Sequence, residues 1–292
     1  MHLSAKNMIA THRPYIIYGT AWKKDQTSAL VSQAVHAGFR FIDTACQPKH
    51  YNEAGVGEGW TTAASQLGLD RSDFFLQTKF TAVKGQDPEN VPYDVDAELE
   101  DQVRQSVEKS LENLQTDYID SLVLHSPMKT MEETLRVWSV FEQFVDEGTV
   151  LQLGISNCYN LRDLKQLYKT ATIKPAILQN RFHKETGFDI KIRNACYNMG
   201  ITYQSFWTLS ANRKALATSE WKDVAEKKGL TSQTLMYVFM MTLEHTPLSG
   251  TTDPHHMQED VDVMLKVQVG EIFLDDEEMK YLSALLGMHV QK

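Results

Sequence analysis

Short apolar runs alternate with amphipathic stretches along most of this chain, and this alternation limits the fold more than any other feature. Each run has the length of a buried strand, and the stretches between them repeat apolar residues at helical spacing. One helical stripe consists of Leu99, Val103, Val107, Leu111 and Leu114. The predicted strands are Phe39–Ala45, Phe75–Phe80, Ser121–His125, Leu151–Ser156, Ala176–Asn180, Ile201–Ser205, Thr246–Gly250 and, with a weaker pattern, Val267–Phe273.

The predicted helices also carry signals at their first residues. Thr130 followed by Glu133 has the pattern of a capping box, in which each side chain bonds the other residue's backbone amide. Asp253 precedes Pro254, which suits the first position of a helix because proline has no amide hydrogen to leave unbonded there. These signals predict helices that begin directly after Thr130 and Asp253.

Strands alternating with helices, without a linker rich in Pro, Gly or Ser, predict an α/β fold. We expect one domain over residues 1–292, a single (β/α)8 barrel of the TIM type. The preceding segment Arg13–Trp22 is predicted to form a strand or hairpin that closes the barrel floor. A doubly wound open sheet stays as the alternative, because its strands and helices alternate in the same way.

Charge and cysteine content exclude several classes of function. The 292 residues include 29 Lys and Arg against 38 Asp and Glu, so the net charge of −9 disfavours a general binder of nucleic acids or anionic membranes. The three cysteines lie far apart, without metal-binding spacing. The first ten residues lack a secretory signal, and no apolar run approaches the ~20 residues of a membrane span. We expect a cytoplasmic protein, a monomer or weak homo-oligomer, that acts on a small molecule.

Polar or ionisable side chains end each of the first six predicted strands. In a parallel barrel these ends meet at one face, where the chemistry of such folds takes place. The residues concerned are Asp43, Lys79, His125, Ser156 with Asn157, Gln179 with Asn180, and Gln204 with Ser205. Tyr51 follows Asp43 and is expected to join them.

Four of these residues together indicate a proton donor for carbonyl reduction. A lysine beside a phenol lowers the pKa of the phenol, so that Tyr51 could donate a proton near neutral pH. Asp43 would keep the Lys79 ammonium charged, and a neutral His125 would direct a carbonyl oxygen toward the phenol. Hydride addition to an aldehyde or ketone creates the alkoxide that such a donor protonates.

Several short motifs of the chain resemble, in the same order, those of the aldo-keto reductase superfamily. The first are Gly38-Phe-Arg-Phe-Ile-Asp-Thr-Ala and Tyr51-Asn-Glu-Ala-Gly-Val-Gly-Glu-Gly59. Then follow Gln77-Thr-Lys79, Tyr118-Ile-Asp-Ser-Leu-Val-Leu-His125, Leu153-Gly-Ile-Ser-Asn157, Leu178-Gln-Asn180 and Tyr203-Gln-Ser205. The resemblance spans roughly residues 13 to 286 and implies a barrel that binds a nicotinamide dinucleotide.

The resemblance implies roles for individual residues. Tyr51 would be the general acid, with Lys79, Asp43 and His125 as its catalytic partners. Cofactor contacts would come from Gly19, Thr20, Ala21, Asp43, Ser156, Asn157, Gln179, Gln204, Ser205, Ser249, Gly250, Thr251, Thr252 and His256. An open substrate pocket would be lined by Trp22, His125, Phe80, Phe206 and Trp207. The expected cofactor is NADP(H), with NAD(H) as a serious alternative, and no metal is expected.

The sequence departs from the family pattern in three places. Tyr51 lies eight residues after Asp43, which is farther than usual, and Pro48 would have to bulge the loop for Tyr51 to reach the site. His50 could face the pocket instead. Gln204 stands where an aromatic residue usually stacks on the nicotinamide. Leu248 and His256 stand near the positions where basic residues often hold the 2′-phosphate.

Two other functions stay open at this point. Lys79 could act as a Schiff-base nucleophile in an aldolase-type barrel, which would need a lysine that is partly neutral. The chain could also be a non-catalytic barrel that binds a nicotinamide nucleotide as a redox sensor or regulatory subunit. The displaced Tyr51 and the altered cofactor end motivate this third interpretation.

Overall fold

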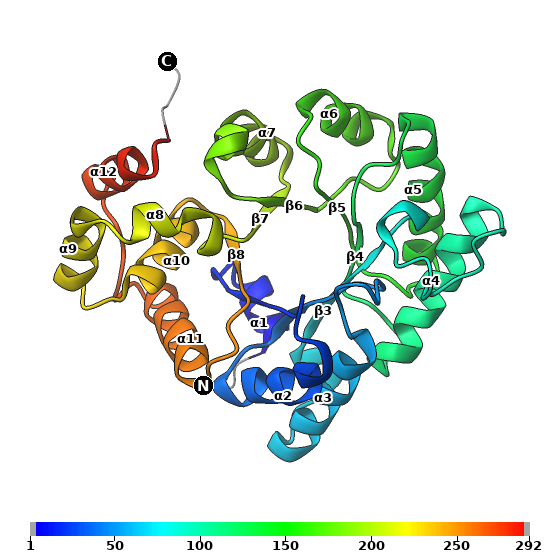
Figure 1. The fold of residues 1–292 in the computed structure, drawn as a ribbon, viewed down its shortest axis with the longest axis horizontal. Helices are drawn as coiled ribbons and strands as arrows, with labels where there is room; N and C mark the ends of the chain where they lie inside the picture. Colours follow the sequence, from blue (N-terminus) through cyan, green and yellow to red (C-terminus); the bar gives the residue numbers. More distant parts are fainter. Residues whose placement is uncertain (1–3, 289–292) are drawn as a thin grey trace.

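The computed structural model describes residues 4–288 and closes eight parallel strands into a barrel in chain order (Figure 1). The first strand pairs with both the second and the last, which excludes the open sheet and confirms the predicted (β/α)8 barrel. The strands are β1 Ile17–Gly19, β2 Phe41–Asp43, β3 Phe75–Phe80, β4 Ser121–Leu124, β5 Leu153–Ser156, β6 Ile177–Arg181, β7 Thr202–Phe206 and β8 Thr246–Ser249.

Two of the predicted strand assignments are wrong. The segment Arg13–Trp22 contributes β1 to the barrel wall, where Ile17 pairs with Leu248, and does not form a separate strand or hairpin under the floor. The segment Val267–Phe273 is no strand, because it finishes a helix and continues as a loop with Val269 65% and Phe273 63% exposed. Residues so open to solvent cannot belong to the buried wall of a parallel barrel.

Helices surround the barrel, as Figure 1 shows. Their bounds are α1 Ala5–Ala10, α2 Thr27–Ala37, α3 Glu53–Leu67, α4 Leu99–Leu114, α5 Met131–Asp146, α6 Leu161–Thr170, α7 Ile190–Met199, α8 Arg213–Leu216, α9 Ser219–Lys227, α10 Ser232–Thr242, α11 Pro254–Gln268 and α12 Asp276–Leu286. Short 3-10 helices are η1 Lys24–Gln26, η2 Arg71–Asp73, η3 Val83–Gly85, η4 Lys184–Asp189 and η5 Ser210–Asn212. Within residues 4–288, no helix has the length and apolar character needed to cross a bilayer.

The predicted helix starts are confirmed. Thr130 and Glu133 form the reciprocal capping box in front of α5. The side chain of Asp253 accepts the backbone amide of His255, with Pro254 as the first residue of α11. This cap fixes the amino terminus of α11 at the same end of the barrel as the carboxyl end of β8, which is the side on which the site forms.

The glycine-rich segment at residues 55–59 is part of α3 and serves packing. A Cβ atom on Gly57 would lie 2.0 Å from the carbonyl oxygen of Asn113 in α4. A Cβ atom on Gly59 would lie 2.5 Å from the carbonyl oxygen of Ser28 in α2. Glycine therefore lets α3 approach both neighbouring helices closely, and the segment is no phosphate-binding loop.

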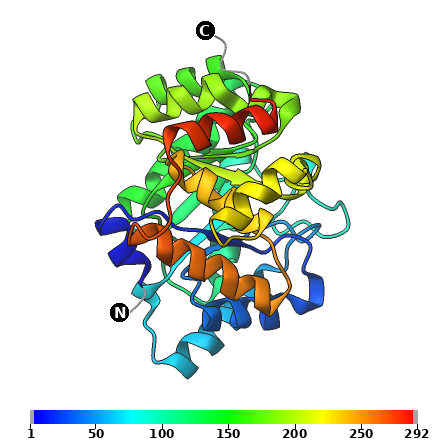
Figure 2. The same cartoon turned by 90° about the vertical axis from the view of Figure 1, so that its left-hand side faces the viewer.

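The two ends of the barrel interior differ in character. At the amino ends of the strands the rings of Tyr15 and Phe41 stack with centroids 3.7 Å apart, and Phe75 packs beside them. The helix α1, drawn in dark blue at the left of Figure 2, buries the side chains of Ala5 and Met8. It packs next to η2, just before β3. This end is an apolar plug, so the polar groups of the interior gather at the opposite end.

Candidate active site

A cavity of about 880 Å³ opens at the carboxyl ends of the strands. Trp22 and Trp207 at its wall are 59% and 50% exposed, so this part of the cavity is open to solvent. The predicted site residues that line it are Gly19, Thr20, Ala21, Trp22, Asp43, Tyr51, His125, Ser156, Asn157, Gln179, Phe206, Trp207, Gly250, Thr251, Thr252 and His256. The structure thus brings most of the predicted residues to one cavity.

Other predicted residues lie behind the cavity wall. Phe80 is fully buried and packs against Tyr93, so its predicted contact with substrate is wrong. Successive strand residues face opposite sides, and Phe80 points outward because Lys79 points into the barrel. Ser205 bonds the hydroxyl of Thr208 at 2.7 Å and is completely buried, away from the cavity.

Lys79 and Asp43 form a buried ion pair at the cavity floor, where Asp43 lines the cavity and Lys79 lies behind it. The Lys79 Nζ atom lies 2.7 Å from both carboxylate oxygens of Asp43 and 2.7 Å from the carbonyl oxygen of Thr44. These bonds use all three N–H groups of the ammonium. Burial lowers the pKa of Lys79, and the carboxylate of Asp43 opposes that change. The predicted pairing of Asp43 with Lys79 is present in the structure.

The long loop after β2 brings Tyr51 to this pair. The carbonyl oxygen of Gln47 accepts the backbone amides of His50 and Tyr51, which folds the inserted residues into a turn. The Tyr51 ring lies 5.4 Å from the Lys79 Nζ atom and 6.0 Å from the ring of His125, centroid to centroid. His50 also lines the cavity, where its ring centroid lies 3.9 Å from that of Trp22 with the two ring planes tilted by 34°.

The start of α3 holds Tyr51 in place. Asn52 caps this helix, and the next residue, Glu53, is buried. The Glu53 carboxylate accepts hydrogen bonds from Thr78 on β3 and from Ser110 on α4, the latter at 2.9 Å. Because Thr78 adjoins Lys79, Glu53 fixes the segment that carries Tyr51 against the strand that carries the lysine. Sequence reasoning gave Glu53 no role.

The pKa of Tyr51 differs from the sequence prediction. Burial and the nearby Asp43 carboxylate raise the pKa of Tyr51 well above its ordinary value, whereas a lowered value was predicted. The physical reason is that Asp43 and Thr44 take up the N–H groups of Lys79, so that no hydrogen bond from the ammonium stabilises a phenolate. Tyr51 therefore holds its proton at neutral pH.

His125 is a neutral imidazole at physiological pH. Burial and the charge of Lys79 lower the pKa of His125 to about 3. Its Nδ1 atom lies 2.6 Å from the hydroxyl of Thr81. With the Thr81 hydroxyl as donor, the proton of the imidazole sits on Nε2. Thr81 was missed in the sequence, although it lies two residues after Lys79 and so continues the same face.

Three glutamines surround Asp43 inside the barrel. Gln77 and Gln179 donate to Asp43 Oδ1 at 2.7 and 2.9 Å. Both also donate to Gln204 Oε1, at 2.7 and 2.9 Å. Gln204 is therefore completely buried in this network and does not present a flat surface to the cavity. This network orients Asp43 and, through it, Lys79.

Comparison with known proteins agrees with this geometry. The model of the aldo/keto reductase family matches residues 15–286. The chain belongs to this family. Its members generally reduce carbonyl groups with NAD(P)H.

Individual members of the family are distant from this chain but match most of its length. Glyoxal reductase of Bacillus subtilis is 26% identical over 263 residues, which cover 89% of this chain and 84% of that protein. D-galacturonate reductase of Hypocrea jecorina is 27% identical over 284 residues, covering 89% and 82%. The crystal structure of an aldo/keto reductase from Brucella melitensis has a TM-score of 0.76 at 25% identity, covering 92% of this chain and 94% of that one.

The groups around Gln179 fit the nicotinamide amide of an aldo-keto reductase cofactor. Ser156 donates to the Gln179 backbone carbonyl at 2.7 Å, and Asn157 donates to the carbonyl of His125 at 2.9 Å. Within residues 4–288, the Gln179 Oε1 atom receives no donor, and the residue lines the cavity. A carboxamide NH₂ group would supply that donor.

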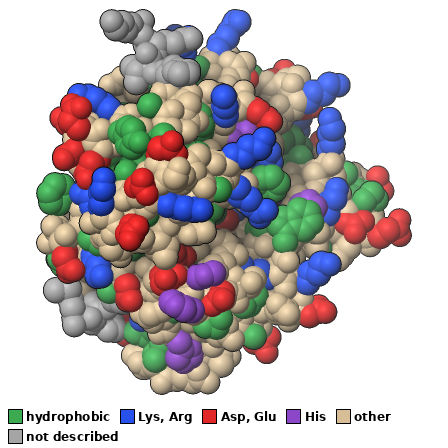
Figure 3. All heavy atoms as spheres, turned by 60° about the vertical axis from the view of Figure 1, so that its left-hand side comes forward, with side chains coloured by type: hydrophobic (Ala, Val, Ile, Leu, Met, Phe, Trp, Pro, Cys, Tyr) green, Lys and Arg blue, Asp and Glu red, His purple; other side chains and the backbone are tan. Residues whose placement is uncertain are grey.

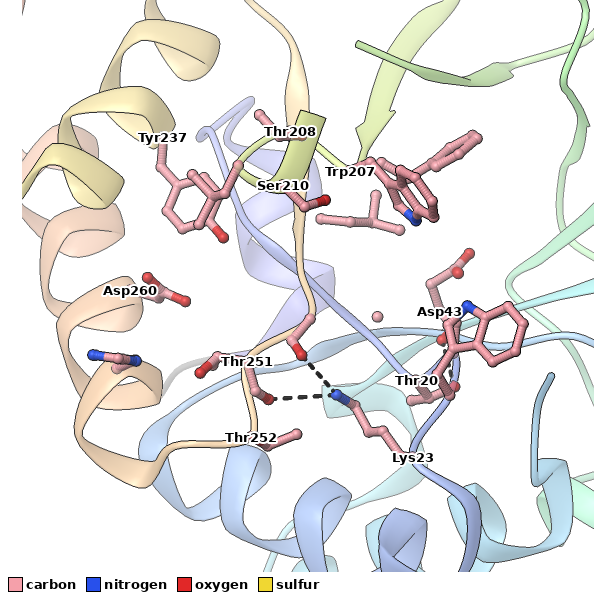
Figure 4. Close-up of a pocket in the computed structure, with 18 of the residues that line it drawn as sticks. Thr20, Lys23, Asp43, Trp207, Thr208, Ser210, Tyr237, Thr251, Thr252 and Asp260 are labelled. Carbon is pink, nitrogen blue, oxygen red and sulfur yellow. Dashed lines mark hydrogen bonds between the residues drawn. The ribbon is translucent and has the colours of Figure 1, made fainter. Parts of the chain in front are cut away.

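The far end of the cavity fits the phosphates and adenosine of the same cofactor. Lys23 donates to the carbonyl oxygens of Gly250 and Thr251 at 2.9 and 3.4 Å, beside the amino terminus of α11 (Figure 4). Burial lowers the pKa of Lys23 to about 8. A cation next to a helix amino terminus suits a diphosphate. Figure 4 shows Asp260 and Tyr237 across the cavity from Asp43, so this end of the cavity is distinct from the end that holds the catalytic groups.

Two buried side chains at this far end, Ser249 and Asp260, are hydrogen-bonded to each other. Ser249 lies behind the wall and donates to Asp260 at 2.6 Å, so its hydroxyl does not point into the cavity. Burial raises the pKa of Asp260 to about 7. Lys23 and Asp260 were both missed in the sequence, because their burial depends on packing between distant segments.

Three residues of the cavity wall have a left-handed backbone. They are Trp22 (φ 67°), Asn157 (φ 53°) and Trp207 (φ 55°), and each follows a barrel strand. Such conformations are costly for residues with side chains and gather at functional sites. At Trp207 the left-handed turn breaks the alternation of β7, so that both Phe206 and Trp207 reach the cavity.

Proposed function

We propose that this protein reduces an aldehyde or ketone to an alcohol with a nicotinamide dinucleotide, and that Tyr51 is the general acid. One observation carries the proposal. The Tyr51 phenol, the neutral His125 imidazole and the buried pair of Lys79 and Asp43 meet at one end of a cavity whose other end suits the phosphates and adenosine of a dinucleotide. Family membership supports the same reaction class.

In this mechanism a nicotinamide cofactor bound near Gln179 would supply the hydride that adds to the carbonyl carbon. His125 donates from Nε2 to the carbonyl oxygen, because Thr81 occupies its Nδ1 atom. This bond turns the oxygen toward Tyr51, which gives up its phenolic proton as negative charge develops. Lys79 keeps a positive charge near the phenol at that moment, and Asp43 fixes the lysine in place.

The raised pKa of Tyr51 favours reduction over alcohol oxidation near neutral pH. A general acid must hold its proton before the reaction, and Tyr51 does so across the physiological range. Oxidation of an alcohol would need the phenolate as base, which burial and Asp43 disfavour. The protein is therefore proposed to work mainly as a reductase.

The charges at the adenosine end favour NAD(H) over the NADP(H) that the resemblance suggests. Glu259 and Asp260 line this part of the cavity, and among the described lining residues the only Lys and Arg are Lys23 and Arg181. A 2′-phosphate would thus meet Glu259 and the buried Asp260, without a lysine or arginine from α11 among the lining residues. His256 could supply a positive charge only when it is protonated.

Cofactor binding and turnover test the proposal separately. Titration with NADH and NADPH should quench the fluorescence of Trp22 and Trp207, and NADH should bind more tightly. Loss of reduced-nicotinamide absorbance with a panel of aldehydes should report turnover. Tyr51→Phe should bind cofactor as the wild type does but lower kcat by about 10²–10⁴-fold.

The same experiment addresses the non-catalytic interpretation. A folded sample that binds a dinucleotide but reduces no carbonyl would support a redox sensor and refute the reductase. Turnover that survives Tyr51→Phe would refute the role of Tyr51. Nothing in the site favours a Schiff base on Lys79, because the amine is hydrogen-bonded three times and lies below the cavity wall.

A further inference from the structure

We propose that Arg181 binds a carboxylate group of the substrate, so that the preferred substrates are aldehydes or ketones that also carry an acid. This inference rests on the proposed carbonyl reduction and narrows its substrate class. The observation that carries it is a guanidinium group at the wall of the cavity that has no acidic partner among residues 4–288.

The position of Arg181 follows from the barrel wall. It ends β6 two residues after Gln179, and strand alternation gives both side chains the same face. The guanidinium carbon lies 4.1 Å from the ring centroid of Trp207 and 5.9 Å from that of Phe206. Stacking against Trp207 holds the planar group in place before a ligand arrives, which lowers the entropy cost of binding.

The guanidinium is not satisfied by the protein itself. Within residues 4–288, no ion pair and no hydrogen bond involves the side chain of Arg181, and its Nε atom is buried without any hydrogen-bond partner. The buried charge of Lys79, by contrast, is compensated, because Lys79 pairs with Asp43. A buried charged donor without a partner is costly, and a planar carboxylate matches its geometry with two parallel hydrogen bonds.

The contacts of Arg181 place it with the catalytic groups and not with the phosphate end. Its backbone amide donates to the Tyr159 hydroxyl at 3.0 Å, and that hydroxyl donates to Asn157 at 3.3 Å. Asn157 in turn donates to the carbonyl of His125. The phosphate end already has Lys23 and the amino terminus of α11.

Arg181 also stands out against the surface charge. The protein carries a net charge of −9, and acidic and basic side chains are interspersed on the face that Figure 3 shows. An anionic substrate therefore meets no broad positive field outside the cavity. Its recognition depends on a local cation inside, and Arg181 supplies that cation beside the reacting groups.

Pairs of substrates that differ only in the acid test this inference. We would compare kcat/KM for ω-oxo carboxylic acids of increasing chain length and for 4-formylbenzoate, each against its methyl ester. The wild type should favour the acid over the ester about tenfold or more for at least one pair. Arg181→Gln should lower this acid-to-ester ratio by about 10–100-fold, as expected for loss of a charge-assisted hydrogen bond.

Arg213→Gln is the matched control, because it removes the same charge from an exposed arginine outside the cavity. It should leave the acid-to-ester ratio at the wild-type value. A ratio near one in the wild type, or a preference that survives in Arg181→Gln, would overturn the inference. An equal loss for acid and ester together with weaker cofactor binding would assign Arg181 to the cofactor and also overturn it.

A binding measurement separates this inference from the proposed function. Calorimetric titration with 4-methylbenzoate and with 4-methylbenzamide needs no turnover. Tighter binding of the carboxylate that is lost in Arg181→Gln would support the site even if no carbonyl were reduced, in which case only the reductase proposal fails. Equal binding of both compounds would overturn the carboxylate site even in an active reductase.

Discussion

Replacing Asp260 by asparagine should stabilise the protein at alkaline pH. Asp260 is 4% exposed, and burial raises its pKa to about 7 against about 4 for an ordinary aspartate. Between these values the folded protein keeps the proton while the unfolded chain releases it. The free energy of unfolding therefore falls as the pH rises, and the loss is complete above about pH 7.

The size of this loss follows from the same pKa values. A difference of about three pKa units corresponds to about 4 kcal/mol of unfolding free energy. Asparagine stays neutral at every pH, and its carbonyl oxygen can still accept the hydrogen bond that Ser249 now gives to Asp260. The variant should thus match the wild type at about pH 4 and be more stable by up to about 4 kcal/mol at about pH 8.

Urea denaturation followed by circular dichroism at several pH values measures this difference. Glu259→Gln removes the same charge from the preceding, less buried position of α11 and should change stability by less than about 0.5 kcal/mol. A stability difference for Asp260→Asn that does not grow between about pH 4 and pH 8 would refute the reasoning. It would mean that the folded protein compensates the Asp260 carboxylate.

Three further predictions concern the reaction and the cofactor. The rate of carbonyl reduction should stay constant across neutral pH, whereas the rate of alcohol oxidation should rise steadily with pH because oxidation needs the Tyr51 phenolate. The same pH dependence for reduction and for oxidation would contradict this prediction. Thr81→Val should lower kcat/KM for carbonyl reduction by about tenfold without weakening cofactor binding, because the His125 proton is no longer held on Nε2 once the Thr81 hydroxyl is gone. An unchanged kcat/KM would argue against the role assigned to Thr81. Lys23→Met should raise the cofactor Kd about tenfold at neutral pH. The wild type should lose cofactor affinity above about pH 8, where Lys23 gives up its charge, and the variant should not. If the variant still lost affinity above that pH, another group would be responsible for the decline.

The fold was predictable because its pattern repeats, but two single elements were not. β1 spans only Ile17–Gly19, which is too short for alternation to show in the sequence. Val267–Phe273 is rich in residues that favour strands, yet its exposure in the folded chain rules out a buried strand. The predicted number of barrel strands was right because two errors cancelled: the segment with β1 was assigned to the barrel floor, and Val267–Phe273 was assigned to the barrel wall.

Site residues could be predicted from the sequence where they stand at the last positions of strands, but not where they lie in the loops beyond the strands. Asp43, Lys79 and His125 were placed correctly by the rule that parallel strands present their carboxyl ends at one face. Thr81 and Lys23 lie past the strand ends, where loop geometry decides what a side chain meets. Phe80 could have been excluded from the sequence alone, because Lys79 before it points inward.

The protonation of Tyr51 shows why residue types alone did not decide the chemistry. The sequence correctly pairs Asp43 with Lys79, but that pair has two consequences of opposite sign for the phenol. It keeps a cation nearby, and it takes up the N–H groups that would stabilise a phenolate. Of the three acceptors of Lys79, the Thr44 carbonyl is the only uncharged one. Formation of the phenolate would therefore require the lysine to turn one N–H group from Thr44 to Tyr51, a change that reduction by the neutral phenol does not need at its start.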